Sequence, residues 1–408
     1  MKRILIISIS AFLISCGSSD RNSEPEEVYD RNQFFVVNYE EILDQPAVVK
    51  LADIAYDVEY IQLETGDNCL LHTYADYYFT DEYIFVDNVY HILQFTRDGR
   101  FIKQIGKQGR GPGEIGLIRM LSVIDNEKLL VAQTNWARKL YYFSYEGEFL
   151  KSVTVPDIMK IRILPDHRQL FYSPPNWGME DFVFSLRNSN GDTLSVTNNH
   201  YNWENKVGYA SSVSYHLFTP FYEYGGIISM KYMYNDTVYH ILADSILPEY
   251  LLNMGKFKLP DEYRVEVAGG GFELFRENSK NYRFAVSFEA NDKLFIASQE
   301  YSKMEEDMQW NMIYDRRSGI GELVADNQGY PGEIINDIDG GADFWPRGTV
   351  NDSTLFVPLL PHQIIGEKNI NEFSAKEALN HEKKTGFLDM VGTLNENDNP
   401  VLMIVRLK

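Results

Sequence analysis

The chain has 408 residues, of which 44% are apolar and 14% are aromatic, including 27 Tyr and 24 Phe. A chain of this length can bury a large core, and so many aromatic side chains suit the wide faces of packed strands. The formal net charge is −21 with only 38 Lys and Arg, which excludes nucleic acid as a partner because phosphate backbones require clustered positive charge.

The first residues predict an export signal. Lys2 and Arg3 precede an apolar run over residues 4–14 that is too short to span a bilayer. Ser15 and Cys16 follow, and this end of the run resembles the lipobox of bacterial lipoproteins. The resemblance implies removal of residues 1–15, lipidation of Cys16 and attachment to a membrane through that lipid. The alternative is an ordinary signal peptide with an incidental cysteine.

A polar tether and one folded domain are expected after Cys16. Residues 16–31 are acidic and poor in apolar side chains, so they cannot build a core. Turn signals then recur without a long linker, which predicts a single domain over residues 32–408. Its one cysteine, Cys69, leaves no internal disulfide to form. We expect a monomeric cell-envelope lipoprotein that faces the periplasm or lies at the outer membrane.

Short β-type runs separated by turn residues repeat along this domain. Early runs at 34–38 and 58–64 could each help to close a ring. The clearest unit covers residues 83–115, where Asp98-Gly99 separates two apolar runs in the manner of a hairpin turn. Its expected strands lie at 83–87, 91–95 and 101–105, followed by a glycine-rich loop. Similar units are expected at 121–155, 161–197, 226–253, 282–324 and 348–358.

The last unit is interrupted. An insertion over residues 362–385 contains the best helix candidate of the chain, residues 371–384. An apolar strand at 401–407 then ends the sequence and must pair with another strand. The expected fold class is all-β, a six-bladed β-propeller of four-stranded antiparallel blades whose ring is closed by terminal strands.

One short motif occurs twice at corresponding places. Residues 112–115 read Pro-Gly-Glu-Ile, and residues 331–334 repeat the same four letters. Each copy follows an expected outermost strand and precedes the next innermost one. A shared function is one interpretation, and a shared turn preference is the other.

The whole domain resembles the six-bladed β-propeller lipoproteins of Bacteroides-type bacteria, which are distantly similar to NHL-repeat propellers. The resemblance implies the same fold and cell-envelope location, and because the family has no established catalytic set it implies no activity. The interrupted last unit departs from the simple repeat. The resemblance is carried by DVEYIQLET at 57–65, the stretch from YIFVDN to GRGPGE at 83–114, NDTVYHI at 235–241, NDIDGGADFWP at 336–346 and NPVLMIVRLK at 399–408.

The loops of one propeller face carry the candidate binding residues. Loops between the second and third strands of a blade open on the same face as loops between blades. Exposed tryptophans beside polar groups on that face could stack on sugar rings, whereas the alternative is that they pack between blades. A glycan, a peptide or an envelope protein is the expected partner. The candidates are Arg110, Glu114, Trp136, Arg138, Trp177, Trp310, Glu333 and Trp345.

Cofactor and catalytic signals are weak. Asp337, Asp339 and Asp343 lie close together in one turn and could hold Ca²⁺, although a tight Asp-Gly turn without metal explains the pattern as well. No cofactor is otherwise expected. No nucleophile, zinc or nucleotide motif occurs, so we expect a binding or scaffolding module. The alternative is a hydrolase or lyase with a metal ion in the central channel.

Overall fold

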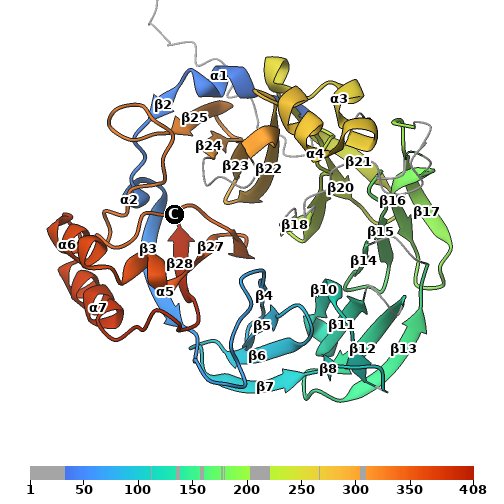
Figure 1. The fold of residues 1–408 in the computed structure, drawn as a ribbon, viewed down its shortest axis with the longest axis horizontal. Coiled ribbons are helices and arrows are strands. Elements are labelled where there is room, and N and C mark those ends of the chain that lie inside the picture. Colours follow the sequence, from blue (N-terminus) through green and yellow to red (C-terminus); the bar gives the residue numbers. More distant parts are fainter. Residues whose placement is uncertain are drawn as a thin grey trace, which may run out of the picture. The chain divides into compact units, whose positions relative to one another are not determined.

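The computed structural model describes residues 33–111, 113–134, 138–156, 160–175, 178, 180–202, 221–265, 267–303 and 309–408. Residues Phe34–Lys408 form one compact unit. Six sheets with four antiparallel strands each are arranged around a central axis as the blades of a propeller, as Figure 1 shows. The predicted fold class, an all-β six-bladed propeller, is therefore confirmed.

Each blade begins at the axis and ends at the rim of the ring. The innermost strands are β4 (Asp76–Phe79), β10 (Ile118–Ile124), β14 (Lys160–Ile163), β18 (Phe221–Tyr224), β22 (Arg283–Ala290) and β26 (Gly348–Asn351). The second strands are β5 (Tyr83–Asp87), β11 (Leu129–Thr134), β15 (Gln169–Tyr172), β19 (Ile227–Met230), β23 (Lys293–Glu300) and β27 (Thr354–Leu359).

The third strands are β6 (Ile92–Thr96), β12 (Lys139–Ser144), β16 (Phe182–Arg187), β20 (Thr237–Ile241), β24 (Trp310–Asp315) and β28 (Val401–Leu407). The outermost strands are β7 (Phe101–Ile105), β13 (Phe149–Thr154), β17 (Thr193–Asn198), β21 (Ile246–Asn253), β25 (Ile320–Val324) and β3 (Ala55–Gln62). We number the blades 1 to 6 from β4 to β26. The unit predicted at 83–115 thus supplies the second to fourth strands of blade 1, with the Asp98-Gly99 turn where expected.

Both ends of the chain close the ring. The last strand, β28, pairs with β27 on one side and with β3, from the start of the domain, on the other. Closure by terminal strands is confirmed, and it leaves blade 6 with four strands despite the insertion. The strand predicted at 34–38 does not close the ring. Instead, β1 (Phe35–Asn38) adds in parallel to the outer edge of β21. A shorter strand, β2 (Pro46–Ala47), adds in parallel to β25 in the same way.

The core is divided among the interfaces between blades. In the described residues, each interface between neighbouring blades has its own cluster of buried apolar side chains. Phe85 and Phe143, for example, belong to the cluster between blades 1 and 2. Because large side chains fill the wedge between twisted sheets, the high Tyr and Phe content predicted this packing.

Helices occur only between strands. They are α1 (Tyr39–Leu43), α2 (Leu51–Ile54), α3 (Asp261–Val265), α4 (Val267–Asn278), α5 (Pro361–Ile364), α6 (Glu367–Ala375) and α7 (His381–Val391), with 3₁₀ turns η1 (Asp125–Glu127), η2 (Gly255–Phe257) and η3 (Tyr301–Lys303), and a small sheet of β8 (Lys107–Gln108) and β9 (Glu114–Ile115). The single helix predicted at 371–384 is wrong in one respect, because the chain leaves α6 after Ala375 and begins α7 at His381. None of the helices in the described part of the chain combines the length and apolar character needed to cross a membrane.

Candidate functional site

The two faces of the ring differ in the length of their connections. Successive strands of a blade run in opposite directions, so the connections alternate between the faces. On one face the first and second strands are joined by tight turns, such as those at 80–82, 225–226, 291–292 and 352–353. The longest connections, at 63–75, 106–117, 254–282, 325–347 and 360–400, all belong to the opposite face. We call that opposite face the long-loop face.

A cavity of about 1170 Å³ lies on the axis of the ring. Residues of all six innermost strands line it, together with Glu333 and Trp345 from the long-loop face and Asp352 from a tight turn of the other face. The cavity therefore extends between both faces. Its volume is somewhat larger than the roughly 300–1,000 Å³ of pockets that enclose small organic ligands.

Two ion pairs line opposite parts of this cavity. Arg347, just before β26 of blade 6, lies 3.8 Å from Asp76 at the start of β4 of blade 1. Arg162 of blade 3 lies 3.6 Å from Glu223 of blade 4. In a six-membered ring, blade 1 faces blade 4 and blade 3 faces blade 6, so acidic and basic groups alternate around the axis.

The two pairs lie at different depths. Asp76 begins its strand and Arg347 directly precedes one, which places both near the long-loop face. Arg162 and Glu223 are each the third residue of an innermost strand. At a rise of about 3.3 Å per residue, the second pair lies roughly 7 Å deeper. A ligand that enters from the long-loop face would meet one ion pair and then the other.

A buried carboxylate stands beside the outer pair. Asp87 is directly opposite Asp76 in the register of β4 and β5, and only 9% of its surface is exposed. Burial, followed by the charge of Asp76, raises the pKa of Asp87 to about 7. The backbone N–H of Val89 donates a 3.0 Å hydrogen bond to Asp87 Oδ1 and opposes this shift. Burial also lowers the pKa of Lys160, at the start of β14.

The raised pKa predicts a pH-dependent stability. An aspartate has a pKa of about 3.9 in an unfolded chain, so between about pH 4 and pH 7 the folded protein keeps a proton on Asp87 that the unfolded chain loses. The contribution of protonated Asp87 to the free energy of unfolding is therefore fully present below about pH 4. It decreases as the pH rises and is lost once the pH passes the folded-state pKa of about 7. Asp87→Asn should reduce the fall in melting temperature between pH 5 and 8, whereas Asp81→Asn in an exposed turn should not. Parallel pH profiles for Asp87→Asn and wild type would contradict this assignment.

Aromatic residues complete the lining. Tyr78 and Tyr222 come from β4 and β18, on opposite blades. The hydroxyl of Tyr222 lies 3.3 Å from that of Tyr250, which lies 2.9 Å from Ser287 Oγ. Burial raises the pKa of both Tyr78 and Tyr222 well above its usual value, so both hydroxyls stay protonated. Both hydroxyls have protein partners, the backbone of Leu121 for Tyr78 and the hydroxyl of Tyr250 for Tyr222, so these tyrosines offer the cavity their rings.

The two Pro-Gly-Glu-Ile copies occupy the same place between two blades, but their glutamate side chains have different surroundings. Ile115 and Ile334 are both fully buried. The carboxylate of Glu114 accepts hydrogen bonds from the backbone N–H groups of Arg110 and Gly111, at 2.9 and 2.8 Å, and closes its own loop. Glu333 instead reaches the solvent of the central cavity. Enclosure by protein, followed by the charge of Asp343, raises its pKa to about 6.

The two described tryptophan candidates pack inside the protein. Trp345 is only 7% exposed, and its ring contacts Phe295 edge-on at a centroid distance of 6.0 Å. The guanidinium of Arg283 covers the ring of Trp310 at 3.6 Å. Trp345 is buried and Trp310 is half-buried, and each ring packs against a protein group, so a ligand-binding role for either stays a prediction. Trp345 also touches the cavity.

Two other predicted binding residues, Arg110 and Arg138, lie in connections of the long-loop face. Arg110 is exposed in the glycine-rich loop, and Arg138 is exposed just before β12. Trp136 and Trp177, after β11 and β15, lie outside the described residues, as does the lipidation candidate Cys16. Their roles stay predictions.

The three aspartates of the acidic turn have separate protein partners. Asp337 Oδ1 accepts from the N–H of Ala52 at 2.9 Å. Asp343 Oδ1 pairs with Lys376 Nζ at 3.0 Å. Asp339 is fully buried and accepts from Asn336 Nδ2 at 2.7 Å and from the Gly341 N–H at 2.9 Å.

These contacts stabilise the turn itself. In the described ranges, no group of three or more His, Cys, Asp or Glu residues is placed to hold a metal ion. Calcium binding by these aspartates stays a prediction, because the described residues show no arrangement that would coordinate the ion.

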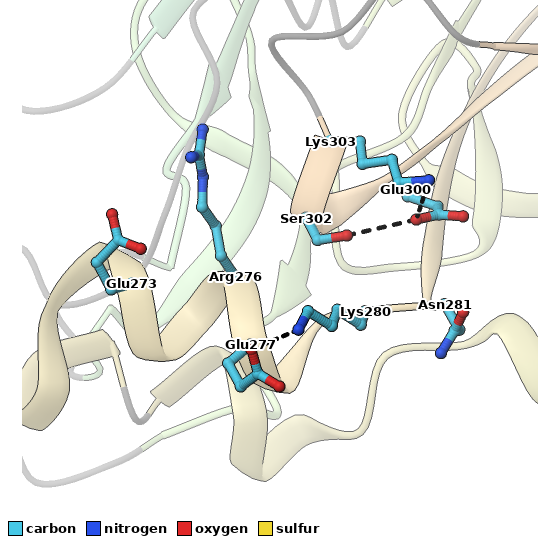
Figure 2. Close-up of a pocket in the computed structure, with 8 residues that line it drawn as sticks. All are labelled: Glu273, Arg276, Glu277, Lys280, Asn281, Glu300, Ser302 and Lys303. Carbon is cyan, nitrogen blue, oxygen red and sulfur yellow. Dashed lines mark hydrogen bonds and ion pairs between the residues drawn. The ribbon is translucent and has the colours of Figure 1, made fainter.

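A second, smaller pocket of about 470 Å³ lies at the end of α4. Figure 2 shows its charged side chains, of which Lys280 pairs with Glu277 at 2.5 Å and Lys303 pairs with Glu300 at 3.5 Å. None of the described residues that line this pocket is aromatic. Its charged groups pair locally, in contrast to those of the central cavity.

Sequence reasoning missed the groups that line the cavity. Asp76 and Glu223 lie on β4 and β18, two innermost strands that were not predicted. Arg162 lies within a predicted strand but belongs to no recognisable motif. Arg347 directly follows Asp-Phe-Trp-Pro at 343–346, in which only Trp345 was a candidate binding residue. Only their common place on innermost strands brings them together.

Comparisons with known proteins bear on the fold and the family. A "putative exported protein" from Bacteroides fragilis has 19% sequence identity and a TM-score of 0.67, with 92% of this chain and 100% of that chain covered. A member of the DUF4221 family from Bacteroides vulgatus has 10% identity and a TM-score of 0.47, with 87% and 97% covered. Virginiamycin B lyase from Staphylococcus aureus has 14% identity and a TM-score of 0.35, with 74% and 94% covered. At these identities, only the likeness to the first protein carries weight, and it concerns the fold alone. No curated protein matches the chain.

The sequence itself gives the family. Residues 34–406, which comprise nearly the whole propeller, match a family described as a domain of unknown function, DUF4934. The chain belongs to this family.

Proposed function

We propose that this protein is a binding module of the cell envelope that takes its ligand into the central cavity through the long-loop face. The observation that carries the proposal is the cavity itself, which has a volume of about 1170 Å³ and a lining of charged groups and tyrosines. A cavity with this mixture can enclose a small polar molecule or the end of a longer chain. Glycans, peptides and the termini of envelope proteins are all of this kind.

The location follows from the sequence. The apolar run before Cys16 indicates export and a lipid anchor, and residues 16–31 then serve as the tether. The first strand of the domain, β1, lies on the outer edge of blade 4, away from the axis. A ligand approaching the cavity along the axis would therefore meet the long loops rather than β1.

A blocking substitution tests the cavity. Thr349 of β26 lines it and is half-buried, so Thr349→Trp should fill part of it and weaken ligand binding by at least about tenfold. Thr193→Trp, on the exposed outermost strand β17, is the matched control and should bind as wild type does.

The binding partner is sought by a thermal-shift screen with peptides and with neutral and acidic oligosaccharides, followed by calorimetry on each hit. Loss of affinity in the Thr349 variant alone is the expected result. Hits that bind both variants equally would place the binding surface elsewhere and contradict the proposal.

A further inference from the structure

We infer that the ligand of the central cavity is a short peptide with free termini, whose ammonium group binds Glu223 and whose carboxylate binds Arg347. This inference rests on the proposed function, because it names the chemical class of the ligand of that same cavity. It is carried by four charged side chains, Asp76, Arg162, Glu223 and Arg347, that make no side-chain hydrogen bond within the described part of the chain.

The ion pairs of the cavity are loose. Arg162 and Glu223 are separated by 3.6 Å, and Arg347 and Asp76 by 3.8 Å. Both distances exceed the 2.7–3.2 Å of a hydrogen bond. Across the described ranges, none of these four side chains makes a side-chain hydrogen bond to the protein, and 25–49% of each side chain is exposed to solvent.

A buried pair elsewhere in the ring shows the contrast. Arg316 donates to Glu249 and Glu289 at 2.9 and 2.7 Å, and all three are buried. That arrangement has the geometry of a structural ion pair. The cavity pairs are long, solvent-accessible and free to exchange partners, so a ligand can form charge-assisted hydrogen bonds there without breaking any in the protein.

The charges of the lining favour a ligand with both signs. Besides Arg162 and Arg347, the cavity is lined by five acidic residues: Asp76, Asp125, Glu223, Glu333 and Asp352. An excess of carboxylates repels a polyanion such as an acidic oligosaccharide. A neutral sugar carries no charge with which to replace the long ion-pair contacts of Arg162 and Arg347. A peptide with free termini supplies one anion for an arginine and one cation for the acidic groups.

The depth of the charges suggests an orientation. Glu223 lies at the deeper level beside Arg162, and Asp125 and Asp352 lie in turns of the opposite face, so carboxylates outnumber arginines most strongly at the far end of the cavity. Arg347 is nearer the long-loop face. A peptide that enters amino end first would place its ammonium at Glu223 and its carboxylate at Arg347. With roughly 3.3–3.6 Å per extended residue, two to four residues suffice for about 7 Å of depth and the lateral step between blades 4 and 6.

Calorimetry with blocked peptides tests the inference. The probe is a pool of tripeptides of the form Ala-Xaa-Ala, compared with the same pool after N-acetylation and after C-terminal amidation. The free pool should bind, and each blocked pool should bind about tenfold more weakly or worse. Glu223→Gln should weaken the free pool but leave the N-acetylated pool unchanged, and Arg347→Gln should show the same pattern with the amidated pool. Glu322→Gln, on the exposed face of β25, is the control and should change nothing.

Each contrary outcome has a distinct meaning. If an oligosaccharide binds and loses affinity in Thr349→Trp while no tripeptide binds, the peptide inference is wrong and the proposed function stands. If tripeptides bind but both blocked pools bind equally well, the assignment of the termini is wrong. If tripeptides bind to wild type and Thr349→Trp alike, the cavity is not their site, and both the inference and the proposed function fail.

Discussion

Removing residues 401–408 is expected to leave the domain unfolded. These residues form β28, which is hydrogen-bonded to β27 on one side and to β3 on the other, so the deletion opens the ring and exposes two strand edges. Six of the seven β28 side chains are apolar and buried. At about 1.5–3 kcal/mol for each buried side chain, their loss removes roughly 9–18 kcal/mol, which is as large as the roughly 5–15 kcal/mol by which a domain is usually stable.

The matched control ends the chain one residue early, at Leu407. It keeps every β28 pair and removes only Lys408, whose backbone N–H bonds to Ile54. Far-ultraviolet circular dichroism and thermal melting distinguish the two variants. The shorter one should lack a cooperative transition, whereas the control should melt within a few degrees of wild type. A cooperative melt for the protein that ends at Pro400 would show that the ring does not depend on this closure.

Arg316→Met is expected to lower the free energy of unfolding by about 3–5 kcal/mol, because it leaves two buried carboxylates without their cation. Arg316 follows β24 of blade 5 and bridges Glu249 of blade 4 to Glu289 of blade 5. Glu249 also lies 2.6 Å from His240 Nε2, and the Arg316 guanidinium stacks over Phe35 of β1 at 4.7 Å. One side chain therefore connects two blades and the added N-terminal strand.

The neighbouring arginine provides the control. Arg317 has 69% of its side chain exposed and pairs with Asp292 at the surface, so Arg317→Met should cost no more than about 1 kcal/mol. Adding Glu249→Gln and Glu289→Gln to Arg316→Met should restore part of the stability, since neutral amides do not repel each other. Equilibrium denaturation in urea measures all four proteins. Equal losses for the two arginine variants would mean that the buried network contributes no more than a surface pair.

The stabilising groups and the candidate binding groups occupy different parts of the ring. Arg316 and the strands β1, β2 and β28 hold blades together at their interfaces and outer edges. Asp76, Arg162 and Glu223 lie on innermost strands and Arg347 directly precedes one, and the described ion pairs there are long and accessible. Substitutions such as Glu223→Gln are therefore expected to alter binding with little change in stability, which keeps the binding experiments interpretable.

Most strands could be predicted from local pattern, and the exceptions have a physical reason. The expected strands at 101–105, 139–144, 182–187 and 401–407 coincide with β7, β12, β16 and β28. The innermost strands β4 and β18 were missed. All four residues of β4 are half-buried, so its sequence lacks the alternation of buried and exposed residues that identifies a strand.

The candidate site could not be predicted because it is assembled from different blades. Asp76 and Glu223 are far apart in the sequence and carry no motif, and Arg347 belongs to a segment that was singled out for its tryptophan. The sequence did identify Glu333, which reaches the cavity. It could not show that Glu114, in the same motif, is hydrogen-bonded within its own loop.

By itself, the sequence determined the repeated strand-and-turn pattern, the closure by a terminal strand and the family, because these depend on the order of apolar and turn residues along the chain. Only the tertiary structure decided which charged residues share the cavity and which tryptophans are covered. Those properties depend on how six sheets meet around one axis, and residues from blades that are distant in sequence become neighbours only when the ring closes.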